Sequence, residues 1–197
     1  LYGLWRVAGR LDGSLRSLKD REYINKGYRV LYQGVEYIKI RAYDSEFAFD
    51  MTDGNNDFIN ALEAMFDLAE ENKKRNYYQS SPMGLRFVGP SDAYLSPEYH
   101  RQVAYIDTPF ILGTPHSDEI LRDYQQIMIA HNGIPHWGKI NSVLNGRPGL
   151  LQQYYPKLEK WQAVYREFNA DGTFSNAFSD RLNLGFIGRT GPQDIIT

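Results

Sequence analysis

Residues 81–112, SPMGLRFVGPSDAYLSPEYHRQVAYIDTPFIL, decide the fold of this chain. Bulky apolar and aromatic residues recur in two runs, 83–88 and 103–112, and this pattern is typical of β-strands. Glycine–proline and serine–proline pairs lie between the runs and predict a loop, because both residues interrupt regular structure. The stretch therefore predicts two strands joined by a long loop.

A strand and a helix are expected before this stretch. Residues 28–50 alternate with the two-residue period of a strand, and Gly34 marks a turn or bulge within them. Asn55 or Asn56 then predicts a helix start, and an apolar stripe at helical spacing follows. Lys73, Lys74 and Arg75 suit the carboxyl end of that helix, where the helix dipole favours positive charge.

Two further helices are expected after it. Ser117 is a candidate N-cap for a helix over 117–130, which Asn132-Gly133 would end. Pro156 predicts the first position of another helix. This order of elements predicts an α+β fold with a large, mainly antiparallel sheet and helices packed on one face.

Composition narrows the classes of function. The net charge of the 197 residues is -2, which gives no basic field for nucleic acid. The longest apolar runs are too short to span a membrane, although a peripheral membrane contact stays open. The absence of cysteine excludes disulfides, thiolate metal ligands and a cysteine nucleophile, but it does not identify the compartment. A cytoplasmic and a membrane-associated location both remain open.

The histidines and serines offer little support for two common enzyme classes. His100, His116, His131 and His136 do not show the H-x-x-x-H or H-x-H spacing of metal ligands, so we expect no metal site. Ser96 lacks the G-x-S-x-G elbow of a serine hydrolase.

The heptapeptide IPHWGKI, residues 134–140, is unusual in composition. Pro135 and Gly138 disfavour a helix, and an exposed loop rarely contains a tryptophan such as Trp137. The segment therefore predicts a compact turn that holds His136, Trp137 and Lys139 in place.

Three ordered blocks resemble one enzyme family. IPHWGK resembles the HWGK signature of the sugar-lactone and alditol oxidases, a branch of the vanillyl-alcohol-oxidase-type flavoproteins. LRFVGPSDAYLSPEYHRQVAYID is similar to that family's strand–loop–strand, in which an E-x-R pair precedes a D-x-x-L-S-P loop. YYPKLEKWQAVYREFNADGTFSNAFSDRL is similar to its closing helix and D-P-x-G-x-F-x-N turn, with Ala170 where proline is usual. The likeness covers 75–184 and is weaker over 28–75.

The resemblance implies a domain arrangement and a reaction. Residues 1–184 would form the substrate-binding cap of an FAD-dependent oxidoreductase, and residues 185–197 would form a tail. The domain that binds most of the FAD is expected upstream in the same parent protein, because the chain starts at Leu1 and contains no glycine-rich phosphate loop. The implied reaction oxidises a CH–OH group of a sugar lactone, polyol or similar alcohol by hydride transfer to flavin. This fragment alone would be inactive.

The resemblance also implies site residues. Lys139 would be the cation that stabilises the reduced flavin, and His136 would contact flavin or substrate or act as a base. Arg86 would be a catalytic residue alongside Lys139 and His136, and Arg86 and Trp137 would bind the substrate. We expect Arg86 and Lys139 to face one cavity on the side of the sheet away from the helices.

One position departs from the family pattern. Gly84 stands two residues before Arg86, where the family has glutamate. Another acid, such as Glu36, would have to reach Arg86, or the substrate or activity would differ. Two alternatives therefore stay open: a non-catalytic binding or interaction domain that kept the cap fold, and the cap of a sterol (cholesterol) oxidase relative.

Overall fold

The computed structural model describes residues 41–185. The strand expectation over 28–40, with Gly34 and Glu36, and the tail beyond Gly185 lie outside the described residues. The limits of the cap domain at 1–184 therefore stay a prediction.

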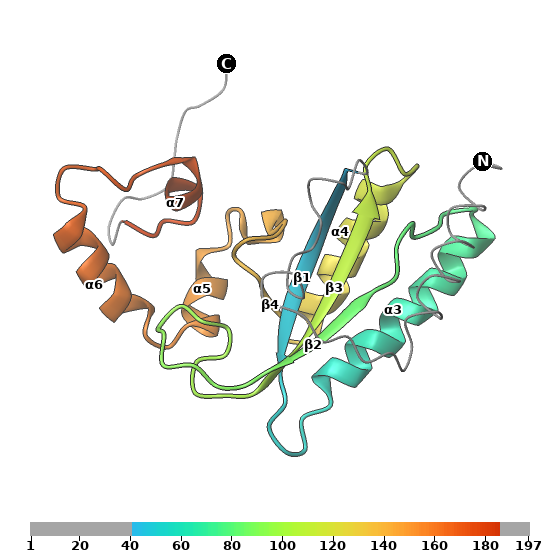
Figure 1. Ribbon diagram of the computed structural model, residues 1–197, viewed down its shortest axis with the longest axis horizontal. Coiled ribbons are helices and arrows are strands. Elements are labelled where there is room, and N and C mark those ends of the chain that lie inside the picture. The colour runs from blue at the N-terminus through green and yellow to red at the C-terminus, as the bar shows by residue number, and fades with distance from the viewer. Residues whose placement is uncertain (1–40, 186–197) are drawn as a thin grey trace, which may run out of the picture.

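Strands and helices follow one another in the order β1, α3, β2, β3, α4, β4, α5, α6, α7 (Figure 1). A single 3-10 turn, η1, lies between β4 and α5. The bounds of the strands are Ala42–Asp50 for β1, Gly84–Val88 for β2, Val103–Ile111 for β3 and Ile134–Pro135 for β4. The helical elements are α3 Asp57–Lys74, α4 Ser117–Ala130, η1 Ser142–Leu144, α5 Pro148–Tyr154, α6 Leu158–Phe168 and α7 Ala177–Arg181.

The described strands form one antiparallel sheet in the order β2-β3-β1-β4. β1 and β3 pair over nine residues each, from Ala42 opposite Ile111 to Asp50 opposite Val103. β2 extends the sheet on the far side of β3, and the short β4 pairs with the middle of β1. The predicted α+β class with an antiparallel sheet is confirmed.

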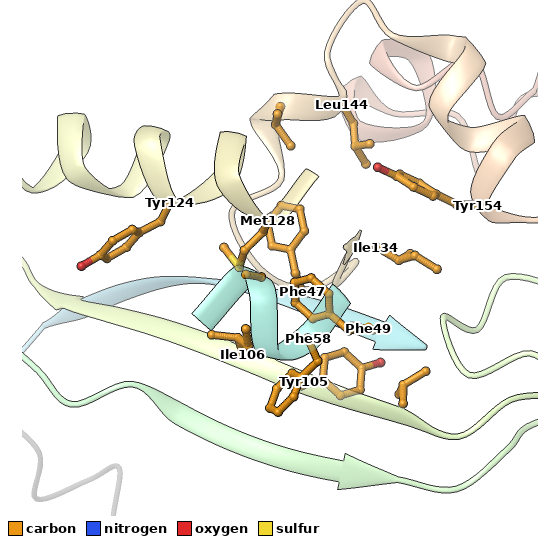
Figure 2. Packing of buried hydrophobic residues seen from close by; sticks show 14 of the residues in the cluster. Phe47, Phe49, Phe58, Tyr105, Ile106, Tyr124, Met128, Ile134, Leu144 and Tyr154 are labelled. Atoms are coloured by element: carbon orange, nitrogen blue, oxygen red, sulfur yellow. The ribbon is translucent and has the colours of Figure 1, made fainter. Parts of the chain in front are cut away.

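Alternate residues of β1 face opposite sides of the sheet, as the strand period requires. Phe47 and Phe49 belong to the set that faces the helices, and Phe49 meets Phe58 of α3 with ring centroids 6.1 Å apart. On the same side, the Gln125 amide of α4 donates to Ser45 Oγ at 2.9 Å. α3 and α4 therefore cover one face of the sheet, as predicted, and part of the core in Figure 2, including Phe47, Phe49 and Phe58, lies on this side.

Several boundaries differ from prediction by one or two residues. The N-cap of α4 is His116, in the left-handed conformation at φ 61°, and Ser117 is the first helical residue. α6 begins at Leu158 instead of Pro156, with Lys157 as its N-cap. Asn56 is the N-cap of α3, as expected, although its side chain makes no capping hydrogen bond.

The 3-10 turn η1 and three further elements were not predicted. α5 and α7 are short helices with little periodicity, and β4 is a two-residue strand inside the heptapeptide that predicted a turn. β4 is a strand because Ile134 and Pro135 lie against β1, not because of local sequence preference. None of the helices between residues 41 and 185 is long and apolar enough to cross a bilayer.

The connection from α4 to β4 is close-packed around Gly133. Its amide donates to the Met128 carbonyl at 2.8 Å, and a Cβ at this position would lie 2.7 Å from that carbonyl oxygen and 2.9 Å from the Phe49 ring. Neither neighbour can move freely, because one is helix backbone and the other is a fully buried ring. Glycine is therefore required where the chain leaves α4 for the HWGK turn.

Gly133→Ala is expected to lower the free energy of unfolding by about 1–3 kcal/mol, because overpacking forces backbone to shift. Urea unfolding of the chain, followed by circular dichroism, measures this change. Gly149→Ala is the matched control: no heavy atom lies within 4 Å of the added Cβ, and α5 tolerates alanine. Equal stability of the two variants would contradict the close-packing argument.

Candidate active-site face of the sheet

Polar residues form a row across the sheet face that α3 and α4 leave uncovered. Gly84 of β2 lies opposite Asp107 of β3, and Asp107 lies opposite Glu46 of β1. The backbone amide of His136, directly after β4, donates to the Glu46 carbonyl at 2.8 Å. Residues opposite one another in antiparallel strands share a face, so the row runs from Gly84 through both acids to His136.

Arg86 joins the two acids of this row. It lies two residues after Gly84, on the same side of β2, and its guanidinium donates through Nη1 to Glu46 Oε1 at 2.7 Å and through Nη2 to Asp107 Oδ2 at 3.2 Å. The Arg86 side chain is 55% exposed, whereas those of Glu46 and Asp107 are 1% and 10% exposed. The arrangement therefore buries two carboxylates beneath a guanidinium that still reaches solvent.

The HWGK turn places a second cation on this face. The Gly138 amide donates to His136 Nδ1 at 3.0 Å, and the Ile140 amide donates to the Asp44 carbonyl at 3.0 Å, so the turn is fixed to itself and to β1. Lys139 Nζ donates to the Asp44 carboxylate, which comes from the same side of β1 as Glu46. An imidazole whose Nδ1 accepts this bond carries its proton on Nε2 when neutral.

Lys139 keeps its positive charge in this position. Burial alone would lower the pKa of its ammonium. The hydrogen bond to Asp44 and the negative charges of Asp107, Asp44 and Glu46 outweigh burial and raise that pKa above its usual value. The lysine is therefore a permanent cation in a part-buried setting, where its field is less screened than at the open surface.

Asp107 is held differently. Burial raises the pKa of its carboxyl, the charges of Lys139 and Arg86 oppose that rise, and the negative charges of Asp44 and Glu46 add to it. The net direction is upward, so Asp107 binds a proton more readily than an ordinary aspartate.

Two oxygens in this group lack partners. Glu46 Oε2 and Asp107 Oδ1 are buried and accept no hydrogen bond from the residues that the structure describes. The three carboxylates of Asp44, Glu46 and Asp107 face the two permanent cations Arg86 and Lys139, which leaves one negative charge in excess. Buried carboxylate oxygens without donors are unfavourable, so this group favours a proton or a donating ligand.

Trp137 points its polar atom away from this group. Its indole Nε1 donates to the Leu95 carbonyl at 2.7 Å, and its ring stacks on Tyr155 with centroids 5.1 Å apart. These contacts fix the HWGK turn to the loop between β2 and β3. Substrate binding by Trp137 stays a prediction.

The same loop is anchored a second time on the candidate face. Glu98 accepts from the hydroxyls of Tyr105 and Ser96, and Tyr105 meets the His136 ring with centroids 6.0 Å apart. Burial would raise the pKa of the Glu98 carboxyl, but the two hydroxyl donors and the nearby His136 lower it overall. Glu98 and Tyr105 therefore border the HWGK turn.

The structure brings together the three residues expected to be catalytic. Arg86, His136 and Lys139 share the face away from α3 and α4, and Arg86 and Lys139 contact neighbouring acids of β1. Two surface cavities, one of about 670 Å³ beside α3 and one beside Arg101, are lined by neither Arg86 nor Lys139. Between residues 41 and 185, no group of three or more histidine or acidic side chains is arranged to hold a metal ion.

Sequence reasoning missed Asp44, Glu46 and Asp107. The acid partner of Arg86 was expected in Glu36, which lies outside the described residues, and the structure provides Glu46 and Asp107 instead. A signal was present in β1: its sequence AYDSEFAFD places three acids, Asp44, Glu46 and Asp50, on one parity of a strand that otherwise consists of aromatic and small residues. Such acids have to be paired or ligand-facing.

Comparisons with known proteins identify the family of this chain. A family model described as D-arabinono-1,4-lactone oxidase matches residues 5–182. L-gulono-1,4-lactone dehydrogenase of Mycobacterium tuberculosis is 28% identical over 177 residues, which cover 89% of this chain and 38% of that protein. L-gulonolactone oxidase of Scyliorhinus torazame is 30% identical over 126 residues, or 61% of this chain and 27% of that protein.

A third relative widens the range of activities. Alditol oxidase of a Streptomyces species is 28% identical over 94 residues, which cover 48% of this chain and 22% of that protein. The aligned part is therefore well under half the length of each of these relatives. Because the family model covers most of the 197 residues, the chain belongs to the D-arabinono-1,4-lactone oxidase family, in the sugar-lactone and alditol branch of the oxidoreductases.

Proposed function

We propose that this chain is the substrate-binding cap of an FAD-dependent oxidoreductase that oxidises a CH–OH group of a sugar lactone, polyol or similar alcohol. One observation carries the proposal: Arg86, Lys139 and His136 meet on a single sheet face around buried acids. Relatives named for L-gulono-1,4-lactone and alditols support this class of substrate.

The residues on this face suit a flavin. The family oxidases use FAD in general, and Lys139 and His136 would contact it. The Lys139 ammonium has three donors, of which Asp44 engages one, so donors remain for a flavin oxygen. FAD, when bound, would accept the hydride from the carbinol carbon. Most of the FAD contacts would come from the FAD-binding domain of the same parent protein, which is the partner that we propose.

Arg86 is suited to hold the substrate. A guanidinium has five N–H donors in a fixed plane, and the acids beneath it use two of its nitrogens. The exposed part of the group can donate to the ring or hydroxyl oxygens of a lactone or polyol, while the acids hold its orientation. Trp137, fixed against Tyr155, would provide an apolar edge near the same site.

The alternative of a non-catalytic binding domain rested on Gly84. Because Glu46 and Asp107 supply Arg86 with two carboxylates, the missing family glutamate no longer argues against catalysis. Nothing on the described face favours a sterol over a polar, oxygen-rich substrate, since its side chains are mainly charged.

Anaerobic reduction of the flavin tests the proposed function. The parent protein, purified with FAD bound, should lose its oxidised-flavin absorbance on mixing with L-gulono-1,4-lactone, D-arabinono-1,4-lactone or an alditol. Bound flavin that none of these compounds reduces would overturn the proposal.

Lys139→Met is expected to slow flavin reduction about 10²–10³-fold, because it removes a preorganised cation from developing negative charge. The effect should appear in the limiting reduction rate more than in substrate binding. Stopped-flow absorbance measures both. Lys160→Met, on the exposed side of α6, is the control and should leave the rate unchanged. A flavin-loaded, stable Lys139→Met protein with the original rate would make Lys139 a packing residue.

The 197-residue chain by itself is expected to purify colourless and to remain so after incubation with FAD and gel filtration. No glycine-rich loop that could bind the pyrophosphate is present in its sequence. Stoichiometric flavin absorbance retained by the isolated chain would contradict the division of roles between cap and FAD-binding domain.

A further inference from the structure

Gly84 leaves a space beside Asp107. A Cβ added at Gly84 would lie 3.4 Å from Asp107 Cβ and 3.6 Å from Asp107 Oδ2, at ordinary contact distance. Because glycine has no side chain, residue 84 adds no cover to this edge of the Asp107 carboxylate, and Arg86 is the residue of β2 that contacts it. Gly84 of β2 and Asp107 of β3 are thus directly opposite one another on neighbouring strands.

Asp107 is also the acid of the group that is best placed to change its protonation. Glu46 is almost fully buried and accepts the shorter bond from Arg86, at 2.7 Å against 3.2 Å for Asp107. Asp44 is paired with Lys139. Asp107 has the longer hydrogen bond to Arg86, and its Oδ1 is buried without a donor. No side chain of residue 84 lies beside its carboxylate.

We propose that Asp107 is the catalytic base of this site. The reacting hydroxyl of the substrate would lie over Gly84, and the Asp107 carboxylate would accept its proton. The inference rests on the proposed function and adds to it the residue that removes the proton. Arg86 would hold a neighbouring oxygen of the same substrate, and Glu46 would position Arg86.

The step balances as a two-electron oxidation. The O–H bond of the substrate breaks, and its proton moves to Asp107 Oδ2. The electron pair of that bond forms the second C–O bond of the carbonyl product, while the carbinol C–H bond breaks and its hydride leaves to the oxidised flavin. One substrate thus loses one proton and one hydride, and the excess negative charge of the acid group is neutralised.

Four charged groups act on the Asp107 carboxyl: Asp44 and Glu46 from β1, Arg86 from β2 and Lys139 from the HWGK turn. The titratable groups Glu98, Tyr105 and His136 contact one another at the border of the HWGK turn. The upward shift in the Asp107 pKa means that the folded chain binds this proton more tightly than the unfolded chain does. Stability from this group is therefore present at low pH and is lost as the pH rises through the folded-state pKa. Asp107→Asn, which is neutral and retains an acceptor for Arg86, should consequently fold at neutral pH.

Kinetics of the flavin-loaded parent protein test the inference. Asp107→Asn should slow flavin reduction about 10²–10⁴-fold and remove the rise of the rate with pH that an acid group produces. Asp107→Glu, which retains a carboxylate, should recover part of the rate and the pH-dependent rise. Asp67→Asn, an exposed position on α3 across the sheet, is the control and should behave as the unmodified protein.

The possible outcomes separate the two proposals. If the unmodified protein is not reduced by any lactone or alditol, the proposed function fails and this inference fails with it. If the unmodified protein is reduced and Asp107→Asn is reduced equally fast with the same pH profile, only the role of Asp107 is wrong.

A second measurement does not depend on activity. Carboxyl ¹³C NMR of the 197-residue chain should show Asp107 titrating above about 3.9, the pKa of an aspartate in a model peptide. Because the acids of the group interact, the observed midpoints belong to the group as a whole. Titration of Asp107 at or below the model-peptide value would overturn the inference.

Discussion

The register between β1 and β3 is the constraint on which the rest of this structure depends. Nine residues of each strand pair, and alternation along β1 sends Phe47 and Phe49 to the helices and Asp44 and Glu46 to the opposite face. A slip of one residue would exchange the two sets and bury both acids against α3 and α4. The packing of aromatic side chains on one face thus fixes the position of charged side chains on the other.

This coupling explains how buried acids are tolerated at the centre of the sheet. Glu46 is as inaccessible as Phe47 beside it. Its carboxylate is held by a guanidinium from β2, and its backbone carbonyl accepts a hydrogen bond from the His136 amide of the HWGK turn. Removing one partner of such a group is costly, since it leaves a charge buried and unpaired. The acid group therefore links β1, β2 and β3 through Arg86, and it also lies at the middle of the candidate site.

Local signals in the sequence were sufficient for the regular elements. The strand periods around Arg86 and Ile106, the helical stripes of α3 and α4, and the Asn132-Gly133 stop all correspond to the structure. β4 was missed because its pairing with β1, not local preference, makes it a strand. The short helices α5 and α7 were missed although each has a local start signal: Pro148 in the first turn of α5, and the capping box of Asn176 and Ser179 in α7. The pairing of Arg86 with Glu46 and Asp107 joins residues 40 and 21 positions apart, so it depends on strand order and register, which a single sequence does not specify. The resemblance identified the cations, whereas their acidic partners required the three-dimensional arrangement.

The anchoring of Trp137 makes its fluorescence sensitive to the position of the HWGK turn. Its indole bridges the HWGK turn and the loop between β2 and β3, with one bond to Leu95 and a stacked ring at Tyr155. The sequence contains three tryptophans, Trp5, Trp137 and Trp161, so two replacements would leave Trp137 as the sole source of indole fluorescence. Its emission would then respond to any displacement of the turn against the loop.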